Sequence, residues 1–199
     1  LQKLDEVSTL CSARPALDAN RASNERRRVS KAIHDAEVKQ RLVSLGAEDS
    51  HRANPYPVRR KKQQAALGLP LFPTTTIGSF PQTKEVRAAR AGYKSGRLSQ
   101  NDYDSFLRRQ TEQAIRFQEE IDLDVLVHGE FERNDMVEYF GEQLSGFTAT
   151  TNGWVQSYGS RCVKPPIIFG DVKRLRPMTI ESSRFSQSMT ANALKGMLT

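Results

Sequence analysis

Glu130 is the residue whose type and position most directly suggest chemistry. It follows the apolar run at 125–127, in the order Val-Leu-Val-His-Gly-Glu. A carboxylate at the end of a buried strand costs free energy unless a cation pairs with it. A ligand ammonium group would provide that cation, but a structural ion pair, for example with Arg133, accounts for the position equally well.

Two further loops contain residues that are typical of anion binding. In Gly78-Ser79, backbone N–H groups and a hydroxyl can converge on an anion such as a carboxylate. Arg161, in the run Tyr-Gly-Ser-Arg-Cys at 158–162, can hold an anionic or planar ligand through two parallel hydrogen bonds. Spacing alone favours the structural alternatives, which are an ordinary turn at Ser79 and a solvated or loop-bracing side chain at Arg161.

The sequence does not predict metal binding within this chain. The soft metal ligands are Cys11, His34, His51, His128 and Cys162, and no two of them form a C-x-x-C, H-x-x-x-H or H-x-C pair. We therefore expect no metal site made wholly within these 199 residues. We expect His128 to be a hydrogen-bonded structural histidine and Cys162 to be a partly buried small residue. The chain contains neither a G-x-G-x-x-G fingerprint nor a P-loop.

The net charge of +7 is unevenly distributed along the chain. Residues 1–68 contain 14 Lys/Arg against 8 Asp/Glu, whereas residues 69–199 contain 16 against 15. A basic arm that binds nucleic acid is one interpretation of the first part. However, Tyr56 is its single aromatic residue, and no aromatic side chain interleaves the basic runs as base stacking requires. The sequence therefore favours solvated helix faces and no nucleic-acid partner.

Composition also bears on location. No run of about 18 apolar residues is present, so we expect no membrane-spanning helix and no membrane partner. The first ten residues lack the basic-then-apolar layout of a signal peptide. Two cysteines are too few for the disulfide framework of a secreted protein of this length, which favours a reducing, cytoplasmic location.

Capping residues predict helices before a boundary near Gly68. Asp35 is expected to begin a helix that runs through Val43, and Gly46 to end it in a left-handed conformation. Pro57 suits the first turn of a second helix, which Gly68 ends. These helices read as linked pieces without a core of their own.

After Gly68 the pattern changes to strands alternating with helices. The β-branched residues at 74–77 predict a short strand, and the apolar run at 125–127 predicts a buried one. Between them, Ser99 with an aspartate three residues later predicts a helix that reaches about Ile121.

A further helix and a hairpin are expected after the second strand. Asn134 or Asp135 begins the helix, which runs through Leu144 and ends at Gly146. The stretch 147–171 is rich in Thr, Gly and β-branched residues, which predicts a hairpin excursion. The alternation as a whole is typical of an α/β fold, in which binding residues lie at the carboxyl ends of the strands.

Three long blocks resemble the cobalamin-independent methionine synthase family. They are LPLFPTTTIGSFPQT at 69–83, DVLVHGEFERNDMVEYFGE at 124–142 and NGWVQSYGSRCVKPPII at 152–168. The resemblance implies an incomplete (β/α)₈ TIM barrel preceded by a helical linker segment. It assigns 1–68 to the helical end of an N-terminal barrel with the interdomain linker, and 69–199 to the first part of the C-terminal catalytic barrel.

The resemblance also implies an activity and its cofactor. The reaction is methyl transfer from 5-methyltetrahydropteroyltri-L-glutamate to L-homocysteine, with zinc activating the thiol and without cobalamin. The zinc ligands are expected beyond Thr199, so this chain alone is expected to be inactive, with no catalytic residue and no metal ligand of its own. The full-length enzyme is expected to be a cytoplasmic monomer. The alternatives are another barrel-fold thiol methyltransferase or decarboxylase, or a basic binding module in 1–68.

Family roles extend only to matching residues of this chain. Ile77, Gly78 and Ser79 match the loop that holds homocysteine, and Glu130 matches the carboxylate that takes its amino group. The methylfolate contact matches Arg161 and Cys162.

Overall fold

The computed structural model describes residues 10–156 and 162–198, with side chains in the first helix from residue 14 onward. In chain order the elements are α2 (Leu10–Val29), α3 (Ala36–Ser44), η1 (Ala47–Ser50), α4 (Tyr56–Leu67), α5 (Lys84–Lys94), α6 (Gln100–Glu120), β1 (Val125–Leu126), α7 (Met136–Gly141), β2 (Leu144–Thr148), β3 (Val155–Gln156), β4 (Cys162–Val163), β5 (Ile167–Arg174), α8 (Ile180–Gln187) and β6 (Ala193–Leu194).

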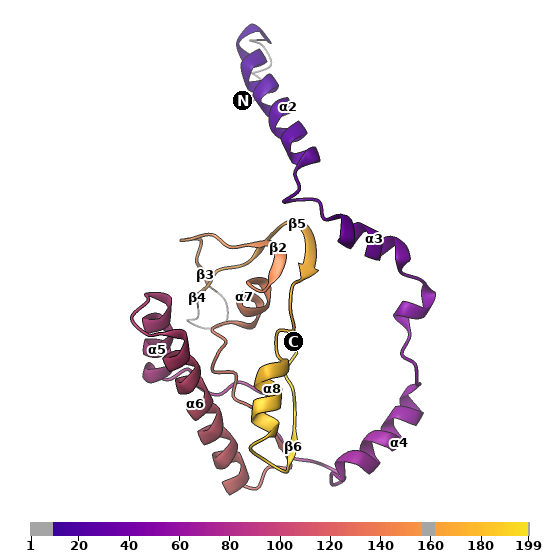
Figure 1. The fold of residues 1–199 in the computed structure, drawn as a ribbon, viewed down its shortest axis with the longest axis vertical. Helices are drawn as coiled ribbons and strands as arrows, with labels where there is room; N and C mark the ends of the chain where they lie inside the picture. Colours follow the sequence, from indigo (N-terminus) through magenta and orange to yellow (C-terminus); the bar gives the residue numbers. More distant parts are fainter. Residues whose placement is uncertain (1–9, 157–161, 199) are drawn as a thin grey trace.

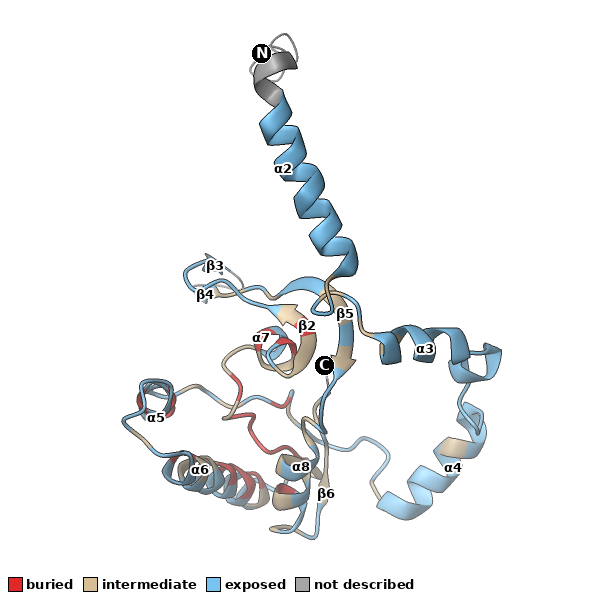
Figure 2. Ribbon diagram, turned by 45° about the horizontal axis from the view of Figure 1, so that its top comes forward, coloured by how far each residue is buried: buried red, intermediate tan, exposed pale blue. Residues whose placement is uncertain are grey.

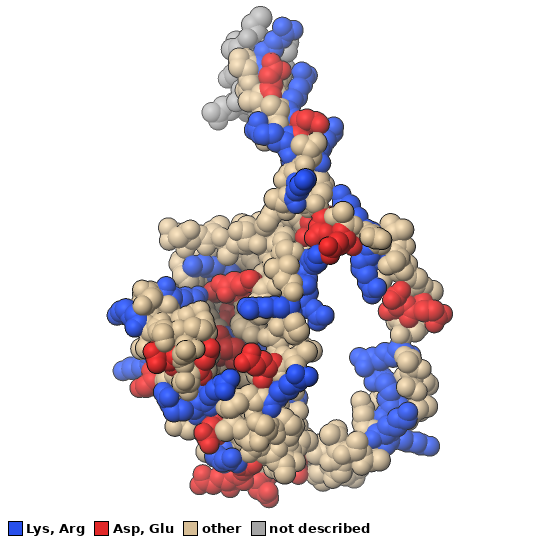
Figure 3. Space-filling model, in the orientation of Figure 1, with Lys and Arg blue, Asp and Glu red and all other residues tan. Residues whose placement is uncertain are grey.

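The helices α2, α3 and α4 form an arm beside the packed part of the chain (Figure 1). The described side chains of these three helices are almost all exposed, and none of them is buried (Figure 2). Many Lys and Arg side chains lie along the arm (Figure 3). The prediction of poorly cored helices in this part of the chain is therefore confirmed.

The predicted helix starts in the arm are confirmed, and one predicted stop is wrong. The Asp35 carboxylate accepts hydrogen bonds from the N–H groups of Glu37 (2.8 Å) and Val38 (3.4 Å). Gly68 ends α4 with a φ of 60°. Gly46 does not end α3 in a left-handed conformation, because its backbone is extended and its N–H donates to Asp49 Oδ2 (2.8 Å) at the start of η1.

Three short segments run parallel and side by side, in the order 74–80, 124–130 and 193–197. Val125 and Leu126 of β1 pair with Ala193 and Leu194 of β6, while isolated parallel bridges join Thr75 to Val125 and Ser79 to Gly129. Helices connect these segments, which confirms the α/β class.

The strand predicted at 74–77 is reduced to the bridge at Thr75. Thr74 donates from both its N–H and its hydroxyl to the Asp124 carboxylate (2.7 and 2.8 Å), so a side chain replaces a backbone partner at this position.

Helices α5 and α6 form the connection between the first two parallel segments, 74–80 and 124–130. The Ser99 hydroxyl accepts from Asp102 N (3.2 Å), as predicted, and α6 ends at Glu120 with Ile121 as its C-cap. Its buried positions recur with helical spacing at 111, 114, 115 and 118, and Val86, Ala114 and Phe131 form a core cluster. Helix α5 was not predicted from the sequence, although the Thr83 hydroxyl caps it by accepting from Val86 N (3.3 Å).

Gln118 holds the end of β1 against α6. Its side-chain Nε2 donates to Val127 O (2.8 Å), and its Oε1 accepts from Val127 N (2.9 Å). The amide thus replaces a neighbouring strand for Val127, which explains why β1 ends one residue before the predicted strand. The side chain of Gln118 is fully buried.

The region after β1 differs from the prediction at one boundary. Helix α7 ends at Gly141, and Leu144 begins β2, so the predicted helix through Leu144 is wrong. Gly146 does not end a helix. It has a φ of 79° inside β2, where the register with β5 shifts. A Cβ at Gly146 would lie 2.4 Å from Asp171 O, so this bulge requires glycine.

The predicted hairpin excursion is present as two nested antiparallel pairs. The outer pair is β2 with β5 and the inner pair is β3 with β4. The outer pair also contacts the arm, because Asp171 N donates to Ile33 O (2.8 Å) and Asp35 N donates to Asp171 Oδ2 (2.8 Å). Lys173 forms ion pairs with Asp35 and Glu37.

In the part of the chain that the structure describes, no helix is long and apolar enough to cross a membrane.

The two hydrogen bonds between the Gln118 side chain and the backbone of Val127, called here the Gln118 clamp, are expected to stabilise the fold. Gln118→Leu leaves both polar groups of Val127 buried without partners, and each such group costs about 1–3 kcal/mol. We expect urea denaturation followed by circular dichroism to give a free energy of unfolding lower by about 2–4 kcal/mol. Gln113→Leu, on the exposed face of the same helix, is the matched control and should change it by less than about 0.5 kcal/mol. Equal effects of the two substitutions would contradict the clamp.

Candidate functional site

The carboxyl ends of the first two parallel segments meet at one place. The bridge between Ser79 and Gly129 brings the Gly78-Ser79 loop beside Glu130, and Phe80 N donates to Gly129 O (2.9 Å). The structure therefore brings together two of the loops that the sequence singled out. We call residues 77–79 and 128–133, with Met197, the strand-end cluster.

Gly78 lies directly against the Glu130 carboxylate. Its φ is +146°, and a Cβ at this position would lie 2.5 Å from Glu130 Oε1 and 2.8 Å from Met197 Cγ and Cε. Any side chain at Gly78 would therefore displace Glu130 or Met197. The loop requires glycine both for its backbone conformation and for the space beside the carboxylate.

Glu130 itself has an uncommon backbone conformation. Its φ is 56°, in the left-handed region that non-glycine residues rarely adopt, and the residue is 8% exposed. Such strain is found mainly where the surrounding structure holds a functional group in place. Arg133 Nη1 donates to Glu130 Oε2 (3.1 Å), so the ion pair suggested as a structural alternative does form.

Arg133 is held on every side, and the residue is 4% exposed. Besides Glu130, its Nε donates to Glu132 Oε1 (2.9 Å) and its Nη2 donates to Met197 O (3.0 Å). The guanidinium also lies 5.2 and 5.3 Å from the ring centres of Tyr139 and Phe140. Three acceptors and two aromatic rings fix its position.

A second buried arginine, Arg90, binds backbone carbonyls of the loop that follows Glu130. Arg90 Nη2, on α5, donates to the carbonyls of Phe131 (2.7 Å) and Arg133 (3.3 Å) and to Gln82 Oε1 (2.6 Å). The turn after Glu130 is therefore fixed through its backbone as well as through the Arg133 side chain.

His128 and Glu132 form a second buried pair. His128 is 2% exposed, and its Nε2 lies 3.0 Å from Glu132 Oε1, which also accepts from Arg133. Because a carboxylate only accepts, His128 Nε2 donates to Glu132, and Nδ1 has no partner among the described residues. The predicted hydrogen-bonded structural histidine is confirmed.

The pKa of Glu132 reflects these neighbours. Burial raises the pKa of this carboxyl, but the hydrogen bond from His128 and the charges of His128 and Arg133 outweigh it, so the pKa lies below the ordinary 4.5. Glu130 and Glu132 thus share one guanidinium. Two carboxylates facing a single guanidinium leave room for a further cationic group beside Glu130.

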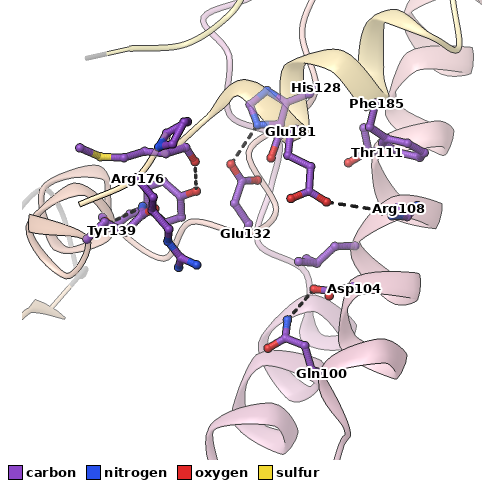
Figure 4. A pocket seen from close by; sticks show the side chains of 15 residues that line it. Gln100, Asp104, Arg108, Thr111, His128, Glu132, Tyr139, Arg176, Glu181 and Phe185 are labelled. Carbon is purple, nitrogen blue, oxygen red and sulfur yellow. Dashed lines mark hydrogen bonds and ion pairs between the residues drawn. The ribbon is translucent and has the colours of Figure 1, made fainter. Parts of the chain in front are cut away.

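A cavity of about 560 Å³ adjoins the cluster on the side of the helices. His128 and Glu132 reach it from the loop after β1, and Arg108 of α6 and Glu181 of α8 line it and form an ion pair with each other (Figure 4). Tyr139 lines it too, and burial raises the pKa of its hydroxyl, which donates to Met178 O (3.1 Å). None of the predicted binding residues that the structure describes lines this cavity.

The predicted binding residues differ in their exposure. Ile77 is 86% exposed and Ser79 is also exposed, so both are open to a ligand. Cys162, on β4, is exposed, so the prediction of a partly buried residue is wrong. Arg161 lies outside the described residues.

Sequence reasoning missed two groups from the third parallel segment. Met197 contributes its carbonyl to Arg133 and its side chain to the space beside Gly78. Lys195 Nζ donates to Thr76 O (2.6 Å), across the end of β1. Neither residue belongs to a motif, and only their position after a strand parallel to β1 could have indicated them.

Among residues 10–156 and 162–198, no group of three or more His, Cys, Asp or Glu side chains is arranged to hold a metal ion. These residues therefore do not fit zinc, and the cluster provides charge and hydrogen bonds only.

Comparison with known proteins gives a consistent set of relatives. Residues 72–199 match the family described as cobalamin-independent synthase, catalytic domain. A 5-methyltetrahydropteroyltriglutamate–homocysteine methyltransferase of Xylella fastidiosa (strain 9a5c) is 58% identical over 205 residues, covering 100% of this chain and 27% of the relative. A protein of the same name from Flavobacterium johnsoniae is 61% identical over 182 residues, covering 92% of this chain and 24% of the relative. The chain thus spans about a quarter of the length of the curated relatives it matches.

One solved structure also resembles the chain. It is a B12-independent methionine synthase from Shewanella sp. W3-18-1 in complex with selenomethionine, with a TM-score of 0.48 and 20% sequence identity over 63% of this chain and 37% of that chain.

The lowered pKa of Glu132 predicts an acid-sensitive contribution to stability. A carboxylate whose pKa falls on folding stabilises the fold above its ordinary pKa of 4.5, and this contribution is lost as the pH falls through the folded value. Glu132→Gln removes it, so wild type should exceed the variant in urea midpoint at about pH 6, and the gap should shrink toward about pH 3. Glu120→Gln, an exposed change of the same charge on α6, is the control and should give a smaller gap. A gap for Glu132→Gln that does not change with pH would contradict the assignment.

Proposed function

The chain belongs to the cobalamin-independent synthase family through its catalytic domain, and from this we propose that it forms part of the substrate sites of a methionine synthase. The proposed reaction transfers the methyl group of 5-methyltetrahydropteroyltri-L-glutamate to L-homocysteine, giving methionine. The observation that carries the proposal is the contact between the Gly78 loop and the Glu130 carboxylate at the ends of parallel strands. This arrangement suits an amino acid, which has one cationic and one anionic group.

The two groups of homocysteine would bind to different parts of the cluster. Glu130 would take the ammonium group, because Glu130 and Glu132 share the single guanidinium of Arg133. The loop Ile77–Gly78–Ser79, in which Ile77 and Ser79 are exposed, would take the carboxylate through its N–H groups and the Ser79 hydroxyl. The thiol would then extend away from both groups toward the methyl donor.

We assign the methylfolate contact to Arg161 and Cys162, of which Cys162 begins β4 in the inner pair of the hairpin excursion. The exposure of Cys162 supports this assignment, because an exposed residue is open to a ligand. The contact through the backbone requires no particular chemistry from the thiol.

The same proposal covers the fold beyond its α/β class. Three parallel segments in sequence order, each joined to the next by helical connections, are consistent with the first strands of a (β/α)₈ barrel, which has eight. We propose that 69–199 is the N-terminal part of this catalytic barrel. The absence of buried side chains from the described part of α2, α3 and α4 supports the assignment of 1–68 to the helical end of a preceding barrel and a linker.

Zinc and the remaining partners follow from the family. Zinc bound to a thiol removes its proton and so provides a nucleophile at neutral pH. We propose that its ligands lie beyond Thr199, that no cobalamin takes part, and that the enzyme acts as a cytoplasmic monomer on homocysteine and methylfolate.

A chimeric enzyme tests the proposed function. This chain replaces the matched stretch of the Xylella fastidiosa relative, and methionine formation is measured with both substrates. We expect activity within about tenfold of the parent. In the chimera, Glu130→Gln should raise KM for homocysteine by about 30-fold or more, because losing one partner of a desolvated ion pair costs about 2–5 kcal/mol. KM for methylfolate should change by less than about twofold.

Glu120→Gln is the matched control for the loss of charge and should leave both KM values unchanged. An inactive chimera, or an equal rise in both KM values for Glu130→Gln, would contradict the proposed function.

A separate prediction concerns metal content. We expect the 199-residue chain, purified and dialysed against zinc-containing buffer, to retain less than one equivalent of zinc, measured by mass spectrometry of the metal. The reason is that its described residues contain no suitable ligand group. One equivalent that is retained by the wild type and lost from the double variant His128→Ala, Cys162→Ala would contradict this.

A further inference from the structure

We propose that Arg133 is a positioning residue that gives the two oxygens of Glu130 different roles. Arg133 holds Oε2, and this leaves Oε1 directed at the Gly78 loop to accept the ammonium group of the substrate. The inference rests on the proposed function of Glu130 in homocysteine binding and adds to it a residue for which the family resemblance gave no role.

The contact to Oε2 is rigid. Arg133 Nη1 donates to it at 3.1 Å from a side chain that is 3% exposed. Because Nε is bound to Glu132 and Nη2 to the carbonyl of Met197, the guanidinium cannot turn away without breaking two further hydrogen bonds. The rings of Tyr139 and Phe140 lie against the same group.

Oε1 has the opposite environment. It is the oxygen nearest to Gly78, where a Cβ would lie only 2.5 Å away. Among the described residues no donor reaches it within hydrogen-bond distance. An ionised carboxylate oxygen at a site this buried favours a donor, and the adjoining loop is the one proposed to hold the other end of the substrate.

The geometry requires arginine rather than any cation. Three different nitrogens serve three acceptors, and these acceptors come from the loop after β1 and from the segment after β6. A lysine has a single nitrogen on a flexible stem, so it could keep the charge but could not hold all three acceptors in this arrangement. Arg133 also separates Glu130 from Glu132, whose like charges would otherwise repel each other across the cluster.

The test uses the chimeric enzyme with Arg133→Met and Arg133→Lys. For Arg133→Met we expect KM for homocysteine to rise by about 10- to 100-fold, with KM for methylfolate changed by less than about twofold. The preference for binding homocysteine over its deamino analogue, measured by calorimetry, should fall by a similar factor. Arg133→Lys should give an intermediate KM, because it restores the charge without the fork. The double variant with Glu130→Gln should lose little beyond Glu130→Gln alone.

The matched control is Arg116→Met, which removes an arginine that also pairs with a carboxylate three residues away, at 2.7 Å, but on the exposed face of α6. It should leave the preference unchanged. If Arg133→Met does not accumulate as folded protein, Arg133→Lys decides the question.

The outcomes separate the two proposals. An active chimera in which Arg133→Lys keeps the wild-type KM and preference would overturn the role of Arg133 and leave the role of Glu130 intact. A wild-type chimera that does not prefer homocysteine over the deamino analogue would overturn the ammonium assignment itself, and the role of Arg133 with it. A parallel loss in kcat and in both KM values would make Arg133 a structural residue only, which also overturns the inference.

Discussion

The buried ion pair of Glu130 and Arg133 is the interaction on which the strand-end cluster depends. Glu130 has a left-handed backbone, and this conformation turns its carboxylate back toward Gly78 and toward Arg133, three residues further on. Burying a charge pair of this kind is favourable only when hydrogen bonds satisfy both partners. Arg133 meets that requirement by donating to three acceptors at once, one of which is Met197 O. One side chain therefore fixes the loop after β1 relative to the segment after β6, which is distant in sequence.

Helices α5 and α6 stabilise the ion pair of Glu130 and Arg133 indirectly. Their side chains form hydrogen bonds with backbone groups that no neighbouring strand reaches. Gln118 binds both polar groups of Val127, and Arg90 binds the carbonyls of Phe131 and Arg133. Buried backbone groups without partners would cost about as much as a lost hydrogen bond each. Polar side chains on α5 and α6 therefore do what longer strands do in a larger sheet. They hold the chain on both sides of Glu130 in the only conformation that directs its carboxylate at Gly78.

Local chemistry made much of the fold predictable, and long-range contacts explain the rest. Helices are capped by the carboxylate of Asp35, the hydroxyl of Ser99 and the left-handed backbone of Gly68. Each of these caps forms without help from distant residues. Gly46 and Gly146 carry the same local signal, but the first begins a 3₁₀ turn and the second allows a bulge against β5, so the neighbouring element decided their conformations. The loops at 77–79 and 128–130 were predictable from the sequence because the carboxyl ends of parallel strands lie at one edge of a sheet. The sequence could not decide whether a ligand or Arg133 is the partner of Glu130. The answer depends on which oxygen of the carboxylate each group meets, and only the three-dimensional structure determines this.

Glu132 extends the same constraint to the cavity beside the helices. Its Oε1 accepts from both Arg133 and His128, so the position of the guanidinium and the tautomer of the imidazole are set by one atom. Among the described residues Nδ1 of His128 has no partner, and the residue lines the cavity to which α6, α7 and α8 also contribute. Any displacement of His128 therefore changes the hydrogen bonding of Glu132 and, through Arg133, the carboxylate of Glu130. Hydrogen bonds between buried side chains thus run from His128 through Glu132 and Arg133 to Glu130, and they connect the cavity to the strand-end loops. The orientation of Glu130 therefore depends on how the helices around the cavity pack. A ligand bound at Gly78 would not touch those helices.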